Sequence, residues 1–233
     1  THWGDEAKGK FVDLIGQDAE VVIRYGGGPN AGHTVHVGDD TYKFHLIPSG
    51  ILNPKVLCVM ADGMVIDPAT LAAEIDALAA RGIRADNLRI SQNAHVILPW
   101  HRDLDRLEEQ WRGAGAIGTT GRGVGPCYAD KASRCGVRMG DLIHPERLRA
   151  RLEAALPLKN AILTKVFDAE PYTVEGLMET LAPFAAALAP YVADTQAIAG
   201  DALAAGRRIL FEGAQATMLD LDGGTYPFVT SSH

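Results

Sequence analysis

"AEVVIRYGGG", residues 19–28, is a short apolar run that ends in three glycines. Residues 19–25 are rich in β-branched side chains, and the glycines that follow are typical of a loop, so the stretch predicts a buried strand that enters a glycine-rich turn. The stretches "KVLCVMADG" (55–63) and "NLRISQNAHVILP" (87–99) repeat this pattern of strand and loop.

A helix is expected between the last two of these strands. Asp67 is suited to the N-cap, Pro68 to the first helical position and Gly82 to the stop. Strands thus alternate with helices, which favours an α/β fold with a mainly parallel central sheet flanked by helices.

Further helices are expected toward the C-terminal side. Residues 101–113 place Leu104, Leu107 and Trp111 on one helical face, and residues 145–156 do the same with Leu148 and Leu152. Residues 174–206 are alanine-rich and helical, with interruptions expected at Pro183 and Pro190, and "RRILFEGAQ" (207–215) predicts another strand that ends in a loop.

No internal repeat or low-complexity linker divides the 233 residues. We therefore expect residues 1–233 to form a single α/β domain. The first residue is Thr1 rather than Met, and the closing "YPFVTSSH" resembles a segment that continues. The domain is accordingly expected to be incomplete at both ends.

Composition narrows the class of protein. With 47% hydrophobic residues the chain can bury a substantial core, and a net charge of -7 argues against a large non-specific nucleic-acid surface. Three cysteines without a C-x-x-C pair disfavour a disulfide framework and favour the cytoplasm. Neither a run of about 18 apolar residues nor a signal peptide is present, so no membrane association is expected.

The opening "THWGDEAKGKF" has the spacing of a phosphate-binding loop. Gly4, Gly9 and Lys10 match G-x-x-x-x-G-K, but Phe11 replaces the hydroxyl residue that normally helps to hold magnesium. An ordinary solvated loop is the alternative. Asp5 favours a functional site over that alternative, because a carboxylate among phosphate-binding amides is unfavourable unless it binds a cation or accepts a proton.

"GGGPNAGHT", residues 26–34, is a second candidate site. Its glycines allow close approach of a ligand, and Asn30, His33 and Thr34 offer an amide, an imidazole and a hydroxyl. His33 could equally be a structural histidine. A zinc site made by His33, His36 and His45 lacks any recognised motif.

Two more glycine-rich stretches follow. "GAGAIGTTGRGVGP" (113–126) carries Thr119, Thr120 and Arg122, which suit a phosphate, although a flexible surface loop is the alternative. "FEGAQATMLDLDGGTYPFVTSS" (211–232) offers Gln215 and Thr230. Because ligands bind beyond the carboxyl ends of parallel strands, we expect these loops to form one crevice for a phosphorylated ligand. Residues 1–233 are therefore expected to form a single nucleotide-binding α/β domain with a fold similar to that of the P-loop NTPases.

Together these stretches resemble the adenylosuccinate synthetase family. The matching motifs are "WGDEAKGK", "NAGHT", "HLIPSGIL", "GTTGRGVGP" and "FEGAQATMLDLDGGTYPFVTSS", in the family's order. The resemblance implies GTP-dependent ligation of IMP and L-aspartate through 6-phosphoryl-IMP, with Mg2+ as cofactor. It also implies a strand before the first motif and a C-terminal portion that recognises guanine and aspartate.

The resemblance further implies residue roles. Asp5 is the catalytic base and a magnesium ligand together with the carbonyl of Gly32, and His33 is the catalytic partner at the GTP phosphates. Arg134 acts on the IMP of the opposite subunit, which implies a homodimer. The implied GTP-binding residues are Gly4, Asp5, Glu6, Ala7, Lys8, Gly9, Lys10, Gly32, His33 and Thr34. The implied IMP-binding residues are Asp5, Lys8, Asn30, Ala31, Gly32, His33, Thr120, Arg134, Gln215 and Thr230.

Two positions depart from the family pattern. Ala7 and Ala216 stand where glycine is usual, and an alanine forced to positive φ costs about 1 kcal/mol. Two other functions remain open at this point: another phosphate-loop ligase or kinase, and a nucleotide-binding regulatory module. IMP binding distinguishes the synthetase from both.

Overall fold

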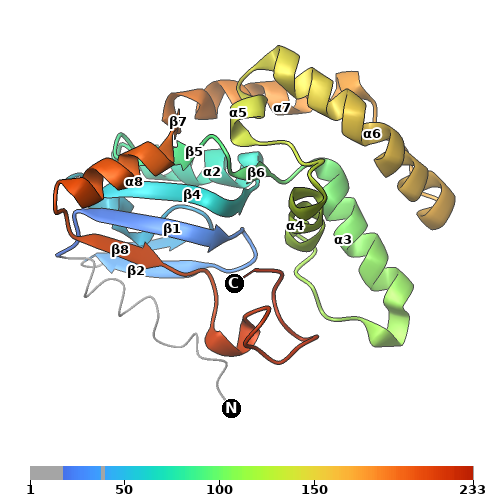
Figure 1. The fold of residues 1–233 in the computed structure, drawn as a ribbon, viewed down its shortest axis with the longest axis horizontal. Coiled ribbons are helices and arrows are strands. Elements are labelled where there is room, and N and C mark those ends of the chain that lie inside the picture. Colours follow the sequence, from blue (N-terminus) through green and yellow to red (C-terminus); the bar gives the residue numbers. More distant parts are fainter. Residues whose placement is uncertain (1–17, 38–39, 233) are drawn as a thin grey trace.

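The computed structural model describes residues 18–37 and 40–232. The opening loop with Asp5, Ala7 and the lysines lies outside them. At the centre is a parallel sheet (Figure 1) in the order β7-β5-β4-β1-β8. Its strands are β1 Val21–Gly27, β4 Leu57–Ile66, β5 Leu88–Ser91, β7 Val192–Ala193 and β8 Ile209–Glu212. The mainly parallel sheet expected from the sequence is confirmed.

Strand residues alternate between two apolar layers. Val22, Cys58 and Met60 belong to the larger core, whereas Val21 and Val59 face a smaller cluster on the opposite side of the sheet. Helix α8, Thr195–Ala204, covers that smaller cluster with Ala202. Both faces are therefore apolar, which is why the strands read as continuous hydrophobic runs.

Five of the other helices pack on the larger core: α2 Pro68–Ala79, α3 Pro99–Arg112, α5 Met139–Leu142, α6 Pro145–Phe167 and α7 Val174–Leu188. Helix α4, Val124–Ser133, packs in a third cluster with Val65 and Ile97. Short 3-10 turns lie at Ser49–Leu52, Gly113–Gly115, Ala189–Tyr191 and Thr217–Leu219. No helix in the described part of the chain has both the length and the apolar content needed to cross a bilayer.

The middle of β4 carries an irregularity that shapes the site. The β1–β4 register shifts between Arg24 and Gly26, and beyond it β4 pairs with the short strand β6, His95–Val96. A Cβ on Gly63 would lie 2.0 Å from the carbonyl oxygen of Tyr25, so this position requires glycine. The hydroxyl of Tyr128 accepts a hydrogen bond from the Gly27 amide at 2.9 Å and joins α4 to this bend.

A separate antiparallel pair, β2 His33–Val37 and β3 Asp40–Phe44, follows β1. It brings the segment after β3 back over the sheet. Residues 45–47 of that segment donate their backbone amides to the Glu74 carboxylate of α2, at 2.6 to 3.3 Å.

Three details differ from the sequence-based expectations. Trp111 is 76% exposed, because the last turn of α3 extends beyond the core that buries Leu104. Helix α7 continues through Pro183, which costs one backbone hydrogen bond without ending the helix. Asp67 does precede α2 as expected, but its carboxylate accepts hydrogen bonds from Thr70 and Arg102 instead of capping a backbone amide.

Candidate functional site

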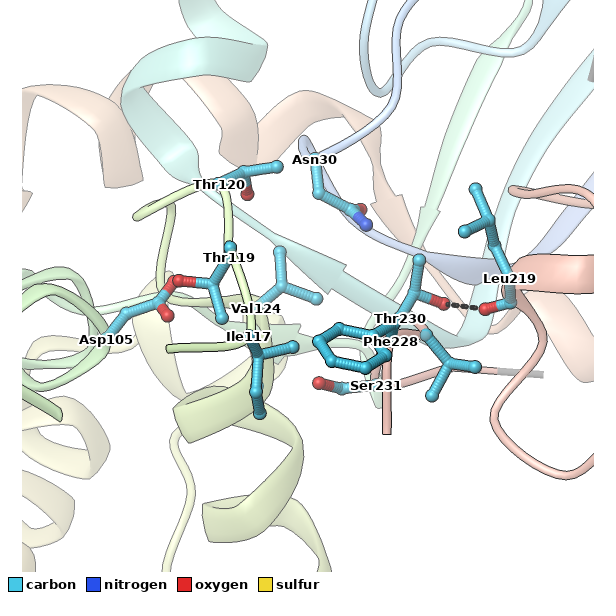
Figure 2. Close-up of a pocket in the computed structure, with 13 residues that line it drawn as sticks. Asn30, Asp105, Ile117, Thr119, Thr120, Val124, Leu219, Phe228, Thr230 and Ser231 are labelled. Atoms are coloured by element: carbon cyan, nitrogen blue, oxygen red, sulfur yellow. Dashed lines mark hydrogen bonds between the residues drawn. The ribbon is translucent and has the colours of Figure 1, made fainter. Parts of the chain in front are cut away.

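Three loop segments and helix α3, which contributes Asp105, meet around one cavity of about 280 Å³. Asn30 comes from the turn after β1, residues 117–125 come from the glycine-rich loop before α4, and residues 219–231 come from the segment after β8. Figure 2 shows the side chains of Asn30, Thr119, Thr120 and Thr230 arranged around this space. The cavity lies close to the lower end of the size range of small-molecule sites.

The cavity offers polar groups on several sides. The buried Oδ1 atom of Asn30 has no hydrogen-bond partner among the described residues. Thr230 donates its hydroxyl to the Leu219 carbonyl at 3.0 Å (Figure 2), which fixes the side chain against the turn that follows β8. Val124 and Phe228 contribute apolar surface. Such a mixture of hydroxyl, amide and apolar groups suits a ligand with both polar edges and a flat ring.

The glycine-rich loop is held from two directions. Arg122 donates to the Pro29 carbonyl at 2.8 Å, which links the loop to the turn that carries Asn30. On the other side, Asp105 of α3 accepts the Gly123 amide at 2.8 Å. Gly118, Gly121 and Gly123 have φ values of 84°, 64° and 77°, which explains why glycine recurs there.

Glu109 of α3 takes three successive loop amides. It accepts from Ile117 at 3.2 Å, from Gly118 at 2.7 Å and from Thr119 at 3.2 Å. Desolvation raises the pKa of the Glu109 carboxyl. Hydrogen bonds from these amides and from Arg112 lower the pKa by more than desolvation raises it, so the net shift is downward. These amides were expected to serve a phosphate. In the structure they are bound to Glu109, which leaves the hydroxyls of Thr119 and Thr120 for the cavity.

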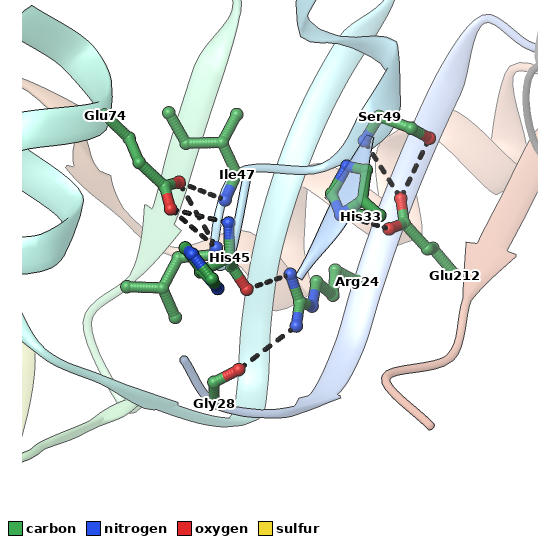
Figure 3. A network of polar contacts seen from close by, with 9 residues as sticks. Arg24, Gly28, His33, His45, Ile47, Ser49, Glu74 and Glu212 are labelled. Carbon is green, nitrogen blue, oxygen red and sulfur yellow. Dashed lines mark hydrogen bonds and ion pairs between the residues drawn. The ribbon is translucent and has the colours of Figure 1, made fainter. Parts of the chain in front are cut away.

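A second polar network surrounds His33 (Figure 3). Nδ1 of His33 lies 4.0 Å from Oε1 of Glu212, within ion-pair distance when the imidazole is protonated. The other Glu212 oxygen accepts hydrogen bonds from the amide and hydroxyl of Ser49, both at 3.0 Å. Glu212 is 2% exposed, so its carboxylate is fixed beside the histidine.

Arg24 completes this network from within β1. Its guanidinium donates to the carbonyl of His45 at 2.6 Å and to that of Gly28 at 3.2 Å (Figure 3). Burial lowers the pKa of Arg24, while the carboxylates of Glu212 and Glu74 act in the opposite direction. A buried cation therefore links the glycine-rich turn after β1 to the segment that follows β3.

The remaining predicted residues occupy different places. Ala31 and Gly32 form the turn before β2, and Thr34 is exposed on β2 opposite Lys43. Gln215 is not part of the cavity lining, because its amide bonds to Ser232, whose hydroxyl donates back at 2.9 Å. The structure thus brings Asn30, Thr120 and Thr230 to the cavity but leaves Gln215 beside it. Ala216 has a φ of -85°, so the alanine there carries no left-handed strain.

Arg134 lies at the opposite end of α4 from the cavity. It is the C-cap residue, exposed, with a φ of 66°. A ten-residue helix is about 15 Å long. Because the cavity touches Val124 and Gly125 at the other end, Arg134 does not line it.

Sequence reasoning missed three carboxylates that organise the site: Asp105, Glu109 and Glu212. Asp105 and Glu109 are one turn apart on α3, a spacing that would place them on one face once the helix was recognised. Glu212 ends a strand directly before a glycine, which is a common position for a ligand-facing residue. The partners of all three carboxylates are distant in sequence or lie in irregular loops, so pattern alone does not find them.

The described residues contain no group of three or more His, Cys, Asp or Glu side chains placed to hold a metal. They therefore give no support to the zinc alternative. The backbone carbonyl of Gly32 is a hard oxygen donor, which together with a carboxylate suits Mg2+. Asp5, the carboxylate in question, lies outside the described residues.

Comparison with known proteins gives the family. A family model for adenylosuccinate synthetase matches residues 1–233. The chain belongs to the adenylosuccinate synthetase family. The adenylosuccinate synthetase of Heliobacterium modesticaldum is 53% identical over 233 residues, which are 100% of this chain and 55% of that relative. The one from Synechococcus sp. is 54% identical over 233 residues, again 100% of this chain, and the match covers 52% of its length.

Two solved structures extend the similarity to the fold. A fully ligated adenylosuccinate synthetase from Plasmodium falciparum superposes with a TM-score of 0.87 at 35% identity, over 99% of this chain and 54% of that one. A succinoaminodeoxyadenylate synthetase of cyanophage S-2L, bound to dGMP and dATP, gives a TM-score of 0.61 at 25% identity, over 98% of this chain and 53% of that one. The chain spans about half the length of the relatives it matches, between 52% and 55%.

Proposed function

We propose that the protein, in its full length, joins IMP and L-aspartate to form adenylosuccinate at the expense of GTP. The family match over residues 1–233 supports this activity. The observation that carries the proposal is that Asn30, Thr120 and Thr230, three residues that the family resemblance assigns to IMP, line one cavity. A regulatory module or an unrelated kinase gives no reason for these three residues to converge.

The reaction proceeds in two transfers. The 6-oxygen of IMP attacks the γ-phosphorus of GTP and GDP leaves, while Asp5 accepts the N1 proton. The amino group of aspartate then attacks C6, and the 6-oxygen leaves with the phosphate. An aspartate with a pKa of about 4 is a weak base for N1, so proton removal accompanies phosphoryl transfer instead of preceding it.

His33 acts at the GTP phosphates in this proposal. Its imidazole lies 4.0 Å from the buried Glu212 carboxylate, which Ser49 holds in place, and the two groups form an ion pair when the ring is protonated. A cation placed beside the transferring phosphoryl group stabilises the charge that develops there. The loop residues Gly4 to Lys10, with Gly32 and Thr34, complete the proposed GTP contacts.

Mg2+ fits the proposed donors. The Asp5 carboxylate and the Gly32 carbonyl are oxygen ligands, which Mg2+ prefers along with waters and substrate phosphates. When bound, the ion neutralises charge on the phosphates. Asp5 then serves both as a metal ligand and as the proton acceptor, which accounts for a carboxylate within a phosphate-binding loop.

A homodimer is proposed in which Arg134 reaches the IMP of the partner subunit. Its exposed position at the far end of α4 supports action outside its own cavity. The cytoplasm is the proposed compartment, because Cys58, Cys127 and Cys135 are all free thiols.

The test is adenylosuccinate formation by the full-length protein with IMP, aspartate, GTP and Mg2+. Leaving out any one substrate should stop product formation, and ATP should not replace GTP. Asp5→Asn should lower the rate at least about 100-fold with an unchanged circular dichroism spectrum, since general-base catalysis typically contributes 10²–10⁴-fold. Isothermal titration with IMP separates the alternatives: a kinase of another substrate or a regulatory module should show no IMP binding.

A further inference from the structure

Two carboxylates on one face of α3 anchor the glycine-rich loop at two places. Glu109 accepts the three amides of residues 117–119, and Asp105 accepts the Gly123 amide. Thr119 and Thr120, whose side chains line the cavity, lie at or between these anchors. The loop is thus held at Thr119 and at Gly123, and Thr120 lies between these two points.

The loop needs such anchors because its own sequence favours many conformations. Residues 113–123 include five glycines, four of them with positive φ, and glycine loses more conformational entropy on ordering than any other residue. Most of residues 113–121 are exposed, so core packing does not order them. Hydrogen bonds to the two acidic side chains supply the order instead.

We propose that Glu109 is a positioning residue for the substrate phosphate. Glu109 holds residues 117–119 against α3 and so places Thr119 and Thr120 opposite Asn30 and Thr230 before the ligand binds. The entropic cost of ordering the loop on binding is therefore smaller. Asp105 serves the same purpose at the other end of the loop. This inference rests on the proposed function, because the phosphate is that of IMP.

Glu109 could instead occupy amides that the phosphate needs, as an internal competitor. The cavity lining argues against this, since it includes Asp105, Ile117, Gly118 and Thr119 but not Glu109. The amides of residues 117–119 therefore donate to a carboxylate outside the cavity. The two possibilities predict opposite effects on IMP affinity when the carboxylate is removed.

Glu108 provides a matched control. It is the neighbouring residue, it carries the same charge, and its carboxylate also pairs with Arg112, at 3.2 Å compared with 2.8 Å for Glu109. Unlike Glu109, it accepts no loop amide within the described part of the chain. An effect that comes from the lost negative charge, or from the lost ion pair with Arg112, should therefore appear both in Glu108→Ala and in Glu109→Ala.

The experiment measures steady-state kinetics of full-length Glu109→Ala, Glu109→Gln and Glu108→Ala. For Glu109→Ala we expect the KM for IMP to rise about tenfold, as lost loop hydrogen bonds of this kind imply, with kcat within about twofold. Glu109→Gln should lie between Glu109→Ala and the wild type, because the amide retains one acceptor oxygen. Glu108→Ala should match the wild type, and the KM for GTP should not change.

Hydrogen exchange gives a second, local measurement. Amides of residues 117–119 should exchange faster in Glu109→Ala, while those of β1 and β4 stay protected as in the wild type. An unchanged or lowered KM for IMP in Glu109→Ala, or an equal rise in Glu108→Ala, would overturn the positioning role alone. A wild-type protein that neither binds nor converts IMP would overturn the proposed function together with this inference.

Discussion

Nδ1 of His33 lies 4.0 Å from Oε1 of Glu212, although the two residues are 179 positions apart in the chain. Parallel pairing of β1 with β8 places Glu212 opposite Arg24, and His33 opens β2 six residues after β1 ends. Ser49 holds the other Glu212 oxygen through its amide and hydroxyl. The histidine proposed for catalysis therefore has a buried carboxylate in a fixed position beside it.

Glu212→Gln should lower kcat about tenfold or more, because it keeps the shape of the side chain but removes the negative charge 4.0 Å from His33. The KM for IMP should change little. Stability should also fall, by about 1–3 kcal/mol, since buried Arg24 loses a nearby negative charge. Steady-state kinetics and thermal unfolding measure the two effects. Ser49→Ala, which removes only one hydrogen bond to Glu212, is the control, and an undiminished kcat in Glu212→Gln would refute a role for this pair.

Asp130 should make the fold sensitive to acid. The imidazole of His101 lies 2.9 Å from its carboxylate, Lys159 pairs with its other oxygen, and all three side chains are buried. Because Nδ1 of His101 accepts the Leu98 amide, Nε2 carries the proton and donates it to Asp130. Burial raises the pKa of Asp130, but the bonds from His101 and Lys159 outweigh it and lower that pKa to about 2.

The sign of the effect follows from this lowered pKa. The carboxylate is charged in the folded state at pH values where an unfolded aspartate, with a pKa of about 4, begins to protonate. Its stabilisation is therefore complete above about pH 5 and declines toward pH 2. Asp130→Asn should cost about 2–3 kcal/mol at neutral pH, and the difference from the wild type should shrink as the pH falls. Urea unfolding across this range measures it. A difference that is constant with pH would contradict the assignment.

Gly63→Ala should prevent normal folding or destabilise the protein by more than about 3 kcal/mol, because its Cβ would lie 2.0 Å from the Tyr25 carbonyl oxygen where β1 and β4 shift register. Gly200→Ala is the matched control. Gly200 lies within α8 with no atom within 4 Å of the added carbon, so alanine there should be neutral or stabilising. Thermal unfolding compares the two, and equal stabilities would contradict the described β1–β4 contact.

Mixing Asp5→Asn subunits with Arg134→Leu subunits should restore activity that neither variant has alone. If Arg134 acts on the partner's IMP, each hybrid dimer contains one site with both defects and one site with neither. Random exchange of equal amounts then yields up to about a quarter of the wild-type rate. Subunit exchange is verified with differently tagged chains. Confirmed exchange without any recovery would rule out action across the dimer.

Local patterns predicted the elements whose partners are close in sequence. β1, α2 and the burial of Leu148 and Leu152 followed from strand runs, a proline start and helical spacing. Trp111 shows the limit, because periodicity gives the face of a helix but not how far the core extends along it. Likewise, propensity marks Pro183 as a break, while packing of Leu181 and Leu188 keeps α7 intact around it.

Site residues were predictable from the sequence where residue type and loop context alone suggest a ligand. Asn30, Thr120 and Thr230 were found from glycine-rich loops with polar residues, and they do line one cavity. Glu109, Asp105 and Glu212 were not found, because acidic residues on a helix or at a strand end are common. Their significance depends on which amide or imidazole the fold brings to them.

Oxygen-18 tracing tests the proposed chemistry most directly. IMP labelled with oxygen-18 at the 6-position is converted by the full-length protein with unlabelled GTP and aspartate, and the released phosphate is examined by mass spectrometry. If the 6-oxygen attacks the γ-phosphate and later leaves with it, each phosphate carries one label and each adenylosuccinate carries none from that position. Unlabelled phosphate formed alongside adenylosuccinate would contradict the 6-phosphoryl intermediate and the role assigned to Asp5.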